Sequence, residues 1–291
     1  MMQHRFKIKT PPEFSYEFSL GFLTRSPKEL MHAVHERTVR KLLKIDGELV
    51  LFSVSEDEGH LVVEVSSQHH SDKIEAYVRE WFDLDADLSK FYALAKGDPV
   101  LKPIVKKFHG YRIMGQPDLF ESLIWAVLGQ QINLAFAYSI KQRFVEKYGE
   151  RFDYEGHSYY LFPTPERVST LTHDDLLPLQ FSRQKSNYTI GIAQAFLNKQ
   201  VSREIFHGRP LKEAKEELMK IKGIGNWTAN YALMRTFRYP DAFPLEDVAL
   251  HKALFIQMNM RKRPSLDRVK KIFRKYKGWE AYATLYLWKT L

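Results

Sequence analysis

The chain contains no cysteine among its 291 residues. Disulfides, thiol nucleophiles and iron–sulfur clusters held by Cys are therefore excluded. No apolar run is long enough to cross a bilayer, and the opening residues 1–12 lack the apolar core of a signal peptide. No His cluster has metal-site spacing, and no Walker phosphate-binding pattern is present. We therefore expect a protein of the reducing cytosol with no membrane anchor and no cofactor.

The charge of the chain is unevenly distributed. The net charge is +9 and the pI is about 9.4. Residues 1–100 hold 13 Lys or Arg and 17 Asp or Glu, a net charge of −4, whereas the remaining residues hold 31 and 18, a net charge of +13. A basic half beside an acidic half predicts a polyanionic partner, with nucleic acid as the first candidate. A basic surface without a partner is the alternative.

The first part of the chain predicts a small α+β domain, residues 1–98. Residues 14–66 have the composition of strands, and 49–54 and 61–65 form the clearest pair, separated by a polar turn at 56–59. Asp46-Gly47 marks another turn. Residues 27–41 are expected to contain a helix, and helical periodicity begins again at Lys73.

The rest of the chain, residues 99–291, is expected to be helical to its end. Asp118 with Glu121 three residues later indicates a helix start, and Pro163-Thr164-Pro165-Glu166 indicates another. The sequence thus predicts an α+β protein with an N-terminal sheet domain and a larger helical region.

The most informative stretch is K-G-I-G-N-W-T-A-N-Y, residues 222–231, within a predicted helix-hairpin-helix at about 211–237. Glycine allows a sharp reversal and a close backbone approach, so Gly223 and Gly225 can expose the N–H groups of the second helix to a phosphate. Ile224 is expected to anchor the hairpin in the core. An ordinary helix–helix connection is the alternative for the glycines alone. A single carboxylate, Asp247, follows 20 residues after Trp227.

Together these features resemble the bacterial 3-methyladenine DNA glycosylase II family of helix-hairpin-helix glycosylases. The similar segments cover nearly the whole length and occur in the family's order; besides the hairpin and Asp247 they are Pro11-Pro12, 20–23, 128–132, 162–165 and 281–288. The resemblance implies an N-terminal sheet domain like a TATA-binding-protein repeat and two all-α subdomains with the active-site cleft between them. It also implies that a damaged nucleotide is flipped out of double-stranded DNA into that cleft. We expect a monomer with no obligate protein partner, which suits an enzyme that scans duplex DNA.

The resemblance makes Asp247 the catalytic residue. A carboxylate beside the sugar stabilises the oxocarbenium-like state of N-glycosidic bond hydrolysis. The alternative is that Asp247 only caps a helix. Related glycosylases that also cut the backbone carry a nucleophilic Lys where this chain has Trp227, so a monofunctional enzyme is expected.

The resemblance also assigns a base pocket to four aromatic residues: Phe22, Trp227, Tyr231 and Trp288. Their faces would attract an alkylated purine, which carries a delocalised positive charge, by cation–π contact. Core packing is the alternative for each of them. Val248 stands where the best-known form of the family has an aromatic residue, which leaves the preferred lesion open.

Contacts with DNA are expected at the hairpin, Gly223, Ile224 and Gly225, and at the probing loop, where Gln131 follows Gln130 and would fill the gap left by the flipped nucleotide. Arg183 and Lys185 are expected to touch backbone phosphate. The resemblance alone implies a monovalent cation on hairpin carbonyls; side chains offer no metal site. Three other functions stay open: a glycosylase/lyase for oxidised bases, a non-enzymatic hairpin module that binds DNA, and an RNA-binding or structural basic protein.

Overall fold

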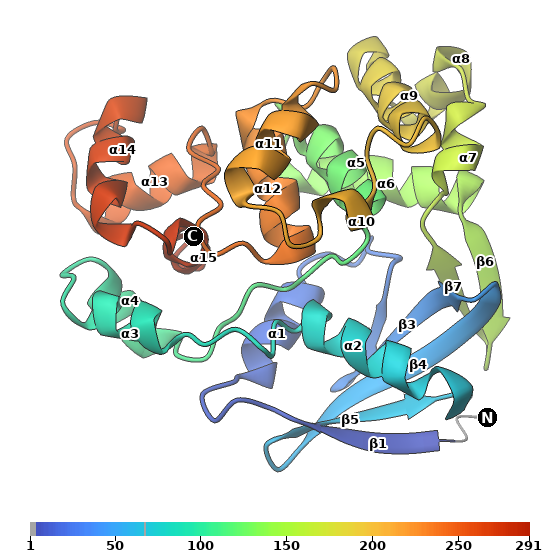
Figure 1. The fold of residues 1–291 in the computed structure, drawn as a ribbon, viewed down its shortest axis with the longest axis horizontal. Coiled ribbons are helices and arrows are strands. Elements are labelled where there is room, and N and C mark those ends of the chain that lie inside the picture. The colour runs from blue at the N-terminus through green and yellow to red at the C-terminus, as the bar shows by residue number, and fades with distance from the viewer. Residues whose placement is uncertain (1–3, 67) are drawn as a thin grey trace.

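The structure is a computed structural model that describes residues 4–66 and 68–291, so residues 1–3 of the opening segment lie outside the described part. A five-stranded sheet forms one end of the molecule and helices form the other (Figure 1). The strands are β1 His4–Lys9, β2 Ala33–His35, β3 Thr38–Ile45, β4 Glu48–Asp57 and β5 His60–Val65. Their order is β1-β5-β4-β3-β2, with every neighbouring pair antiparallel. The predicted α+β class is confirmed.

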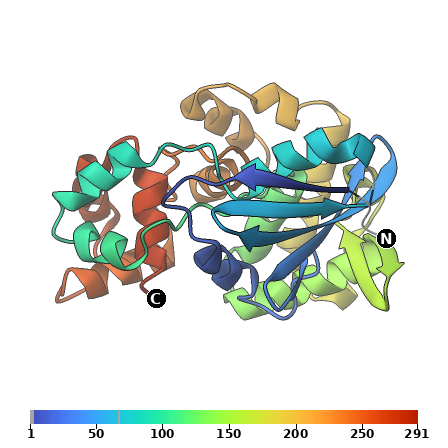
Figure 2. The ribbon, with the colours of Figure 1, turned by 90° about the horizontal axis from the view of Figure 1, so that it is seen from below.

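Two helices complete the sheet domain, α1 Tyr16–Leu23 and α2 Ser71–Trp81. Ile74 and Val78 of α2 are fully buried in a core that they share with Val54 and Val63 of the sheet. Seen from below, the sheet lies nearer the viewer and most helices lie behind it (Figure 2). Burial of one sheet face against helices gives this small domain its own hydrophobic core.

The sheet domain departs from the sequence expectation at two places. Residues 16–23 form a helix, not a strand, because Ser15 Oγ caps it by accepting the Phe18 N–H at 3.3 Å. Residues 27–41 contain β2 and the start of β3, joined by the turn Glu36-Arg37, and not a helix. Pairing of β3 with β4 along the sheet overrides the local helical preference there.

Two hairpin predictions in the same domain are confirmed. Strands β4 and β5 pair as expected, although their ladder extends to Asp57 and His60 and leaves only Glu58-Gly59 in the turn. Asp46 and Gly47 both have positive φ in the turn between β3 and β4. These turns are readable from sequence because their chemistry is local.

Helices dominate the rest of the chain: α3 Ser89–Lys96, α4 Leu101–Lys107, α5 Leu119–Gly129, α6 Leu134–Tyr148, α7 Pro165–Ser169, α8 His173–Leu176, α9 Arg183–Leu197, α10 Arg203–Phe206, α11 Leu211–Met219, α12 Asn226–Phe237, α13 Val248–Gln257, α14 Leu266–Phe273 and α15 Glu280–Trp288. The expectation of helix to the end is wrong at one place, the hairpin of β6 Glu150–Tyr154 and β7 His157–Leu161. Glu155 and Gly156 turn it with positive φ, and β7 packs against β3. That support comes from residues about 115 positions away, as in the ion pair of Arg40 with Glu155.

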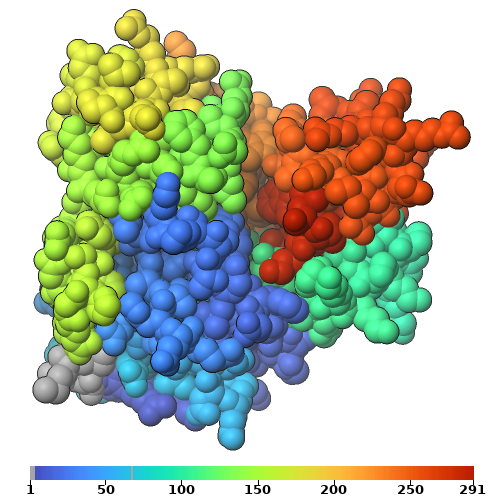
Figure 3. Space-filling model, turned by 180° about the vertical axis from the view of Figure 1, so that it is seen from behind, coloured from blue at the N-terminus to red at the C-terminus, as the bar shows by residue number. Residues whose placement is uncertain are grey.

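The helices form two hydrophobic cores. One joins α5, α6, α9, α11 and α12, and the other joins α3, α4 and α13 to α15. Helix α3 lies before the expected boundary at residue 98, yet its Phe91 packs against Tyr282 and Tyr286 of α15. From behind, the red α15 lies at the bottom of a hollow between the blue and green half and the orange half (Figure 3). In the described ranges, no helix has the length and apolar character needed to span a membrane.

Candidate active site and DNA-binding surface

The helix-hairpin-helix lies where the sequence predicts it, between α11 and α12. Gly223 has φ +97, and a Cβ there would lie 2.2 Å from the Tyr188 ring, so only glycine fits. Ile224 is 4% exposed and anchors the hairpin in the first helical core. Gly225 occupies the N-cap position of α12 and has no side chain to cap it. The first N–H groups of α12, at the positive end of the helix dipole, therefore have no side-chain cap, as the expected phosphate contact requires.

Asp247 is held by three donors. It is the N-cap of α13, and its Oδ1 accepts the Leu250 N–H at 2.7 Å. The indole of Trp288 donates to Oδ1 at 2.8 Å, and the indole of Trp227 donates to Oδ2 at 3.0 Å. Helices α12, α13 and α15 thus meet at one partly exposed carboxylate. The adjacent Glu246 is exposed and accepts from Asn226 instead.

The structure brings three of the four expected aromatic residues together at this carboxylate. Trp227 and Tyr231 are stacked with ring centroids 5.2 Å apart, and Tyr231 lies 6.3 Å from Trp288. Phe22 comes from α1 of the sheet domain, and its ring lies 4.4 Å from the guanidinium of Arg235. That guanidinium also lies 6.0 Å from the Tyr231 ring, so it connects Phe22 to the other three.

The sequence interpretation missed residues that support this cluster. Trp125 of α5 donates from its indole to the Tyr231 hydroxyl at 3.1 Å. Arg235 lies on α12 four residues after Tyr231 and eight after Trp227, so helical spacing alone could have identified it. Arg25, three residues after Phe22 and just past the end of α1, lies 3.8 Å from the Phe22 ring centroid, a local spacing that could also have identified it.

The probing loop is tied to the hairpin. Gln130 ends α5, and its Nε2 donates to the Gly223 carbonyl and to Thr228 Oγ1, both at 3.0 Å. Gln131 is exposed with φ +58, at the tip of the loop. The expected wedge residue therefore projects from a loop whose position depends on the hairpin.

Lys185 does not face the surface expected for a phosphate contact. Its residue is only 9% exposed, and its ammonium donates to the carbonyls of Val127, Leu128 and Gln130 at 3.1, 2.5 and 2.7 Å. Burial lowers the pKa of Lys185 to about 8. This side chain caps the C-terminal end of α5, where a cation is favourable. Arg183 is exposed at the start of α9, as a phosphate contact requires.

Metal binding through side chains finds no support within residues 4–66 and 68–291, where no group of three His, Asp or Glu could hold an ion. A cation on the hairpin would need main-chain carbonyls. Of these, Gly223 O accepts from Gln130, and Ile221 O accepts the Ile224 N–H at 3.1 Å. Each of these two carbonyls thus already accepts one hydrogen bond.

A glycine hairpin that exposes the first N–H groups of α12, beside a carboxylate fixed by two indoles, is the arrangement expected of a protein that acts on a nucleic-acid strand. The model of the HhH-GPD superfamily of base excision DNA repair proteins matches residues 124–278, and that of the 8-oxoguanine DNA glycosylase N-terminal domain matches residues 26–123. The chain therefore belongs to the HhH-GPD superfamily.

Individual relatives extend this match. The chain is 44% identical over 292 residues to a DNA-3-methyladenine glycosylase of Bacillus subtilis, which covers 98% of this chain and 96% of that protein. It is 32% identical to DNA-3-methyladenine glycosylase 2 of Escherichia coli, over 62% of this chain and 61% of that one. The solved structure of a 3-methyladenine DNA glycosylase from Archaeoglobus fulgidus has a TM-score of 0.84 at 23% identity and covers 97% of each chain. These comparisons confirm the family resemblance and the fold.

Proposed function

We propose that this protein is a monofunctional DNA glycosylase that releases alkylated purines from duplex DNA, as a monomer in the bacterial cytosol, and leaves an abasic site. The observation that carries the proposal is the carboxylate of Asp247, fixed by three donors beside the stacked rings of Trp227 and Tyr231. The name of the relative that is 44% identical, DNA-3-methyladenine glycosylase, supports this class of substrate.

The reaction follows from the charge of this carboxylate. The bond between C1′ and the base nitrogen breaks, its electron pair leaves with the base, and positive charge grows on the sugar. Asp247 stabilises that charge electrostatically, and a water oxygen then bonds to C1′ and loses a proton. Because three donors already hold the carboxylate, it does not have to reorganise as the charge develops.

The aromatic rings favour a base that is already cationic. Trp227, Tyr231 and Trp288 offer ring faces next to the carboxylate. A cation over such a face gains about 0.5–2 kcal/mol. An alkylated purine is also a good leaving group, so a site with one carboxylate and no separate acid suffices.

A lyase step would need an amine at the sugar. Lys222 is exposed and precedes the hairpin glycines. The indole of Trp227 occupies the position next to Oδ2. These contacts favour simple hydrolysis over the glycosylase/lyase alternative.

The test is release of methylpurine from methylated duplex DNA, with strand nicks scored before and after alkali. We expect Asp247→Asn to lower the rate by about 10²-fold or more, because an electrostatic group of this kind contributes that much. Nicks should appear only after alkali. The neighbouring change Glu246→Gln is the matched control and should keep most of the wild-type rate.

Two results would contradict the proposal. Equal release by wild type and Asp247→Asn would remove this carboxylate from the mechanism. Binding of damaged DNA without base release by wild type would favour the non-enzymatic module.

A further inference from the structure

Arg235 is a buried cation without an acceptor. The residue is 5% exposed, and its Nε has no hydrogen-bond partner. The charges and hydroxyls that act on it belong to Tyr231, Arg25, Tyr111 and Tyr138, none of them a carboxylate, and the ring closest to its guanidinium is that of Phe22 at 4.4 Å. Burial, and to a lesser degree the charge of Arg25, lower the pKa of Arg235.

The other buried Lys and Arg side chains of the described residues are all paired. Arg112 donates to Glu13 and to two carbonyls, and Lys141 donates to Glu29 and Glu121. Lys41 and Lys185 donate to main-chain carbonyls. A buried charge without a partner destabilises the folded protein. We therefore infer that Arg235 has an acceptor that is not part of the free protein.

The position of Arg235 indicates what that partner is. Trp227, Tyr231 and Arg235 follow each other at four-residue intervals on one face of α12. Trp227 contacts Asp247, Tyr231 stacks on Trp227, and the Arg235 guanidinium lies 6.0 Å from the Tyr231 ring. At a rise of about 1.5 Å per residue, Arg235 lies roughly 12 Å along the helix from Trp227. It is therefore at the end of the row remote from the carboxylate.

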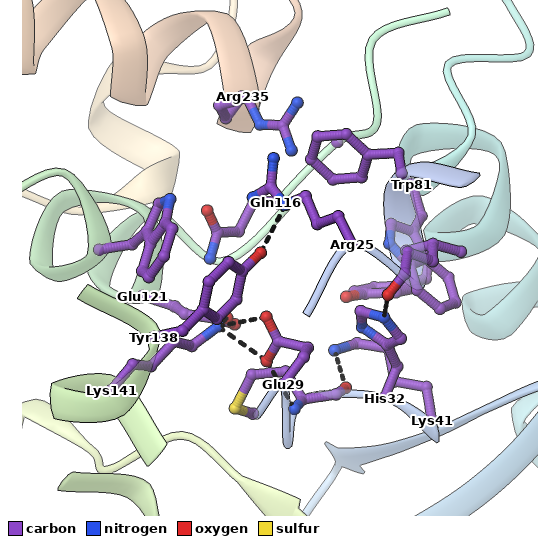
Figure 4. A pocket seen from close by; sticks show the side chains of 16 residues that line it. Arg25, Glu29, His32, Lys41, Trp81, Gln116, Glu121, Tyr138, Lys141 and Arg235 are labelled. Atoms are coloured by element: carbon purple, nitrogen blue, oxygen red, sulfur yellow. Dashed lines mark hydrogen bonds and ion pairs between the residues drawn. The ribbon is translucent and has the colours of Figure 1, made fainter. Parts of the chain in front are cut away.

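A cavity opens beside this end of the row. Its lining includes Phe22, Arg25, Gln116, Tyr138 and Arg235. Figure 4 shows Arg25 bonded to Tyr138, and Lys141 bonded to Glu29, whereas no dashed line reaches Arg235. In this cavity Lys141 is neutralised by Glu29 and Arg25 donates through Nε to Tyr138, whereas the Arg235 side chain has no hydrogen bond to another of the described residues.

We propose that Arg235 is a specificity-determining residue that donates hydrogen bonds to a carbonyl oxygen at position 6 of the extruded purine. The inference rests on the proposed function, because it needs the glycosidic nitrogen of the base to face Asp247. Position 6 lies across the purine from that nitrogen and so points along the row toward Arg235. A 6-oxo group accepts from a guanidinium, whereas a 6-amino group meets it donor to donor.

The test compares three lesions in the same duplex sequence. Hypoxanthine is neutral with a 6-oxo group, 7-methylguanine is cationic with a 6-oxo group, and 3-methyladenine is cationic with a 6-amino group. We expect Arg235→Met to lower kcat/KM for both 6-oxo bases by about tenfold relative to 3-methyladenine, the scale of one lost charge-assisted hydrogen bond. Arg235→Lys, which keeps the charge but not the planar fork, should lie between.

The ratio of rates within one preparation is independent of how much protein is folded. Arg238→Gln is the matched control, because Arg238 lies three residues further on but pairs with Glu80 and Asp83 at 3.6 and 3.8 Å. Its ratio should equal that of wild type.

Equal losses on all three lesions, an unchanged ratio, or the same ratio change in Arg238→Gln would overturn the role of Arg235 and leave the proposed function intact. A loss confined to hypoxanthine would also overturn it, because charge alone would then explain the preference. No release of any base by wild type would overturn both proposals.

Discussion

Lys185 and Arg183 lie two residues apart on α9, and the structure predicts opposite effects for their replacement. The Lys185 ammonium donates to three carbonyls at the end of α5, whereas Arg183 is exposed. Lys185→Met leaves the Leu128 and Gln130 carbonyls without this donor, and Val127 O with only the Gln130 N–H. Hydrogen bonds to a charged group are worth about 1.5–3 kcal/mol each, and the cost of burying the ammonium offsets part of this. We expect the free energy of unfolding to fall by about 2–4 kcal/mol.

Two measurements on each variant separate the roles. Urea unfolding gives the stability, and fluorescence anisotropy at several salt concentrations gives the slope of log K against log salt for a DNA duplex. A lost phosphate contact reduces that slope by about one. Arg183→Met should reduce the slope and leave stability within about 0.5 kcal/mol of wild type. Lys185→Met should lose stability and keep the slope.

The reverse pattern would refute the reasoning. If Lys185→Met folded as stably as wild type and lost one unit of slope, its ammonium would bind phosphate rather than the α5 carbonyls. The order of the probing loop provides a further check, because one of the three carbonyls belongs to Gln130. Hydrogen exchange in residues 129–132 should accelerate in Lys185→Met and not in Arg183→Met.

Two further predictions concern the hairpin and the domain contact. Gly223→Ala should destabilise the protein by more than about 1 kcal/mol, because Gly223 has φ +97 and a Cβ there would meet Tyr188. Gly225→Ala should not destabilise it, because Gly225 has φ −89 and open space around a Cβ. Equal shifts in the melting temperature of the two variants would contradict this. Burial raises the pKa of Asp83 from its ordinary 3.8 to about 6, although the hydrogen bond that Tyr282 donates to this carboxylate lowers the pKa. Between about pH 4 and 6 the folded protein therefore binds this proton and the unfolded chain does not, so the free energy of unfolding falls as pH rises, by up to about 3 kcal/mol. Asp83→Asn should abolish that fall, measured by urea unfolding at several pH values. If the free energy of unfolding changed with pH equally in both proteins, Asp83 would not be its source.

The sequence predicted those features whose determinants are contiguous. The hairpin at 211–237 and the turn at Asp46-Gly47 depend on glycines and flanking residues that lie next to each other. The strands at 33–45 and the hairpin at 150–161 depend on pairing with distant segments, and local propensity misassigned both. Lys185 was misread for the same reason, because its acceptors lie about 57 residues earlier in the chain.

The fold places the basic and the acidic parts of the chain at opposite ends of the molecule. The hairpin, the probing loop and the start of α9 belong to the basic part of the chain, and the acidic first hundred residues form the sheet at the opposite end (Figure 1). A polyanion is therefore attracted to one end of the molecule and repelled from the other. We expect such a field to orient duplex DNA toward the hairpin before any specific contact forms.

The two interpretations of Asp247 that the sequence left open, helix cap and catalytic anion, describe one arrangement. The same Oδ1 that accepts the Leu250 N–H also accepts from Trp288, so the start of α13 fixes the plane of the carboxylate. Asn caps helices about as well as Asp does. Asp247→Asn therefore removes the charge and keeps the cap, but its amide nitrogen cannot accept the Trp227 indole N–H; it should lose activity at a cost in stability of only about 1 kcal/mol. If the fall in the free energy of unfolding were large enough to explain the lost activity, capping would be the dominant role of Asp247. The electrostatic argument would then fail.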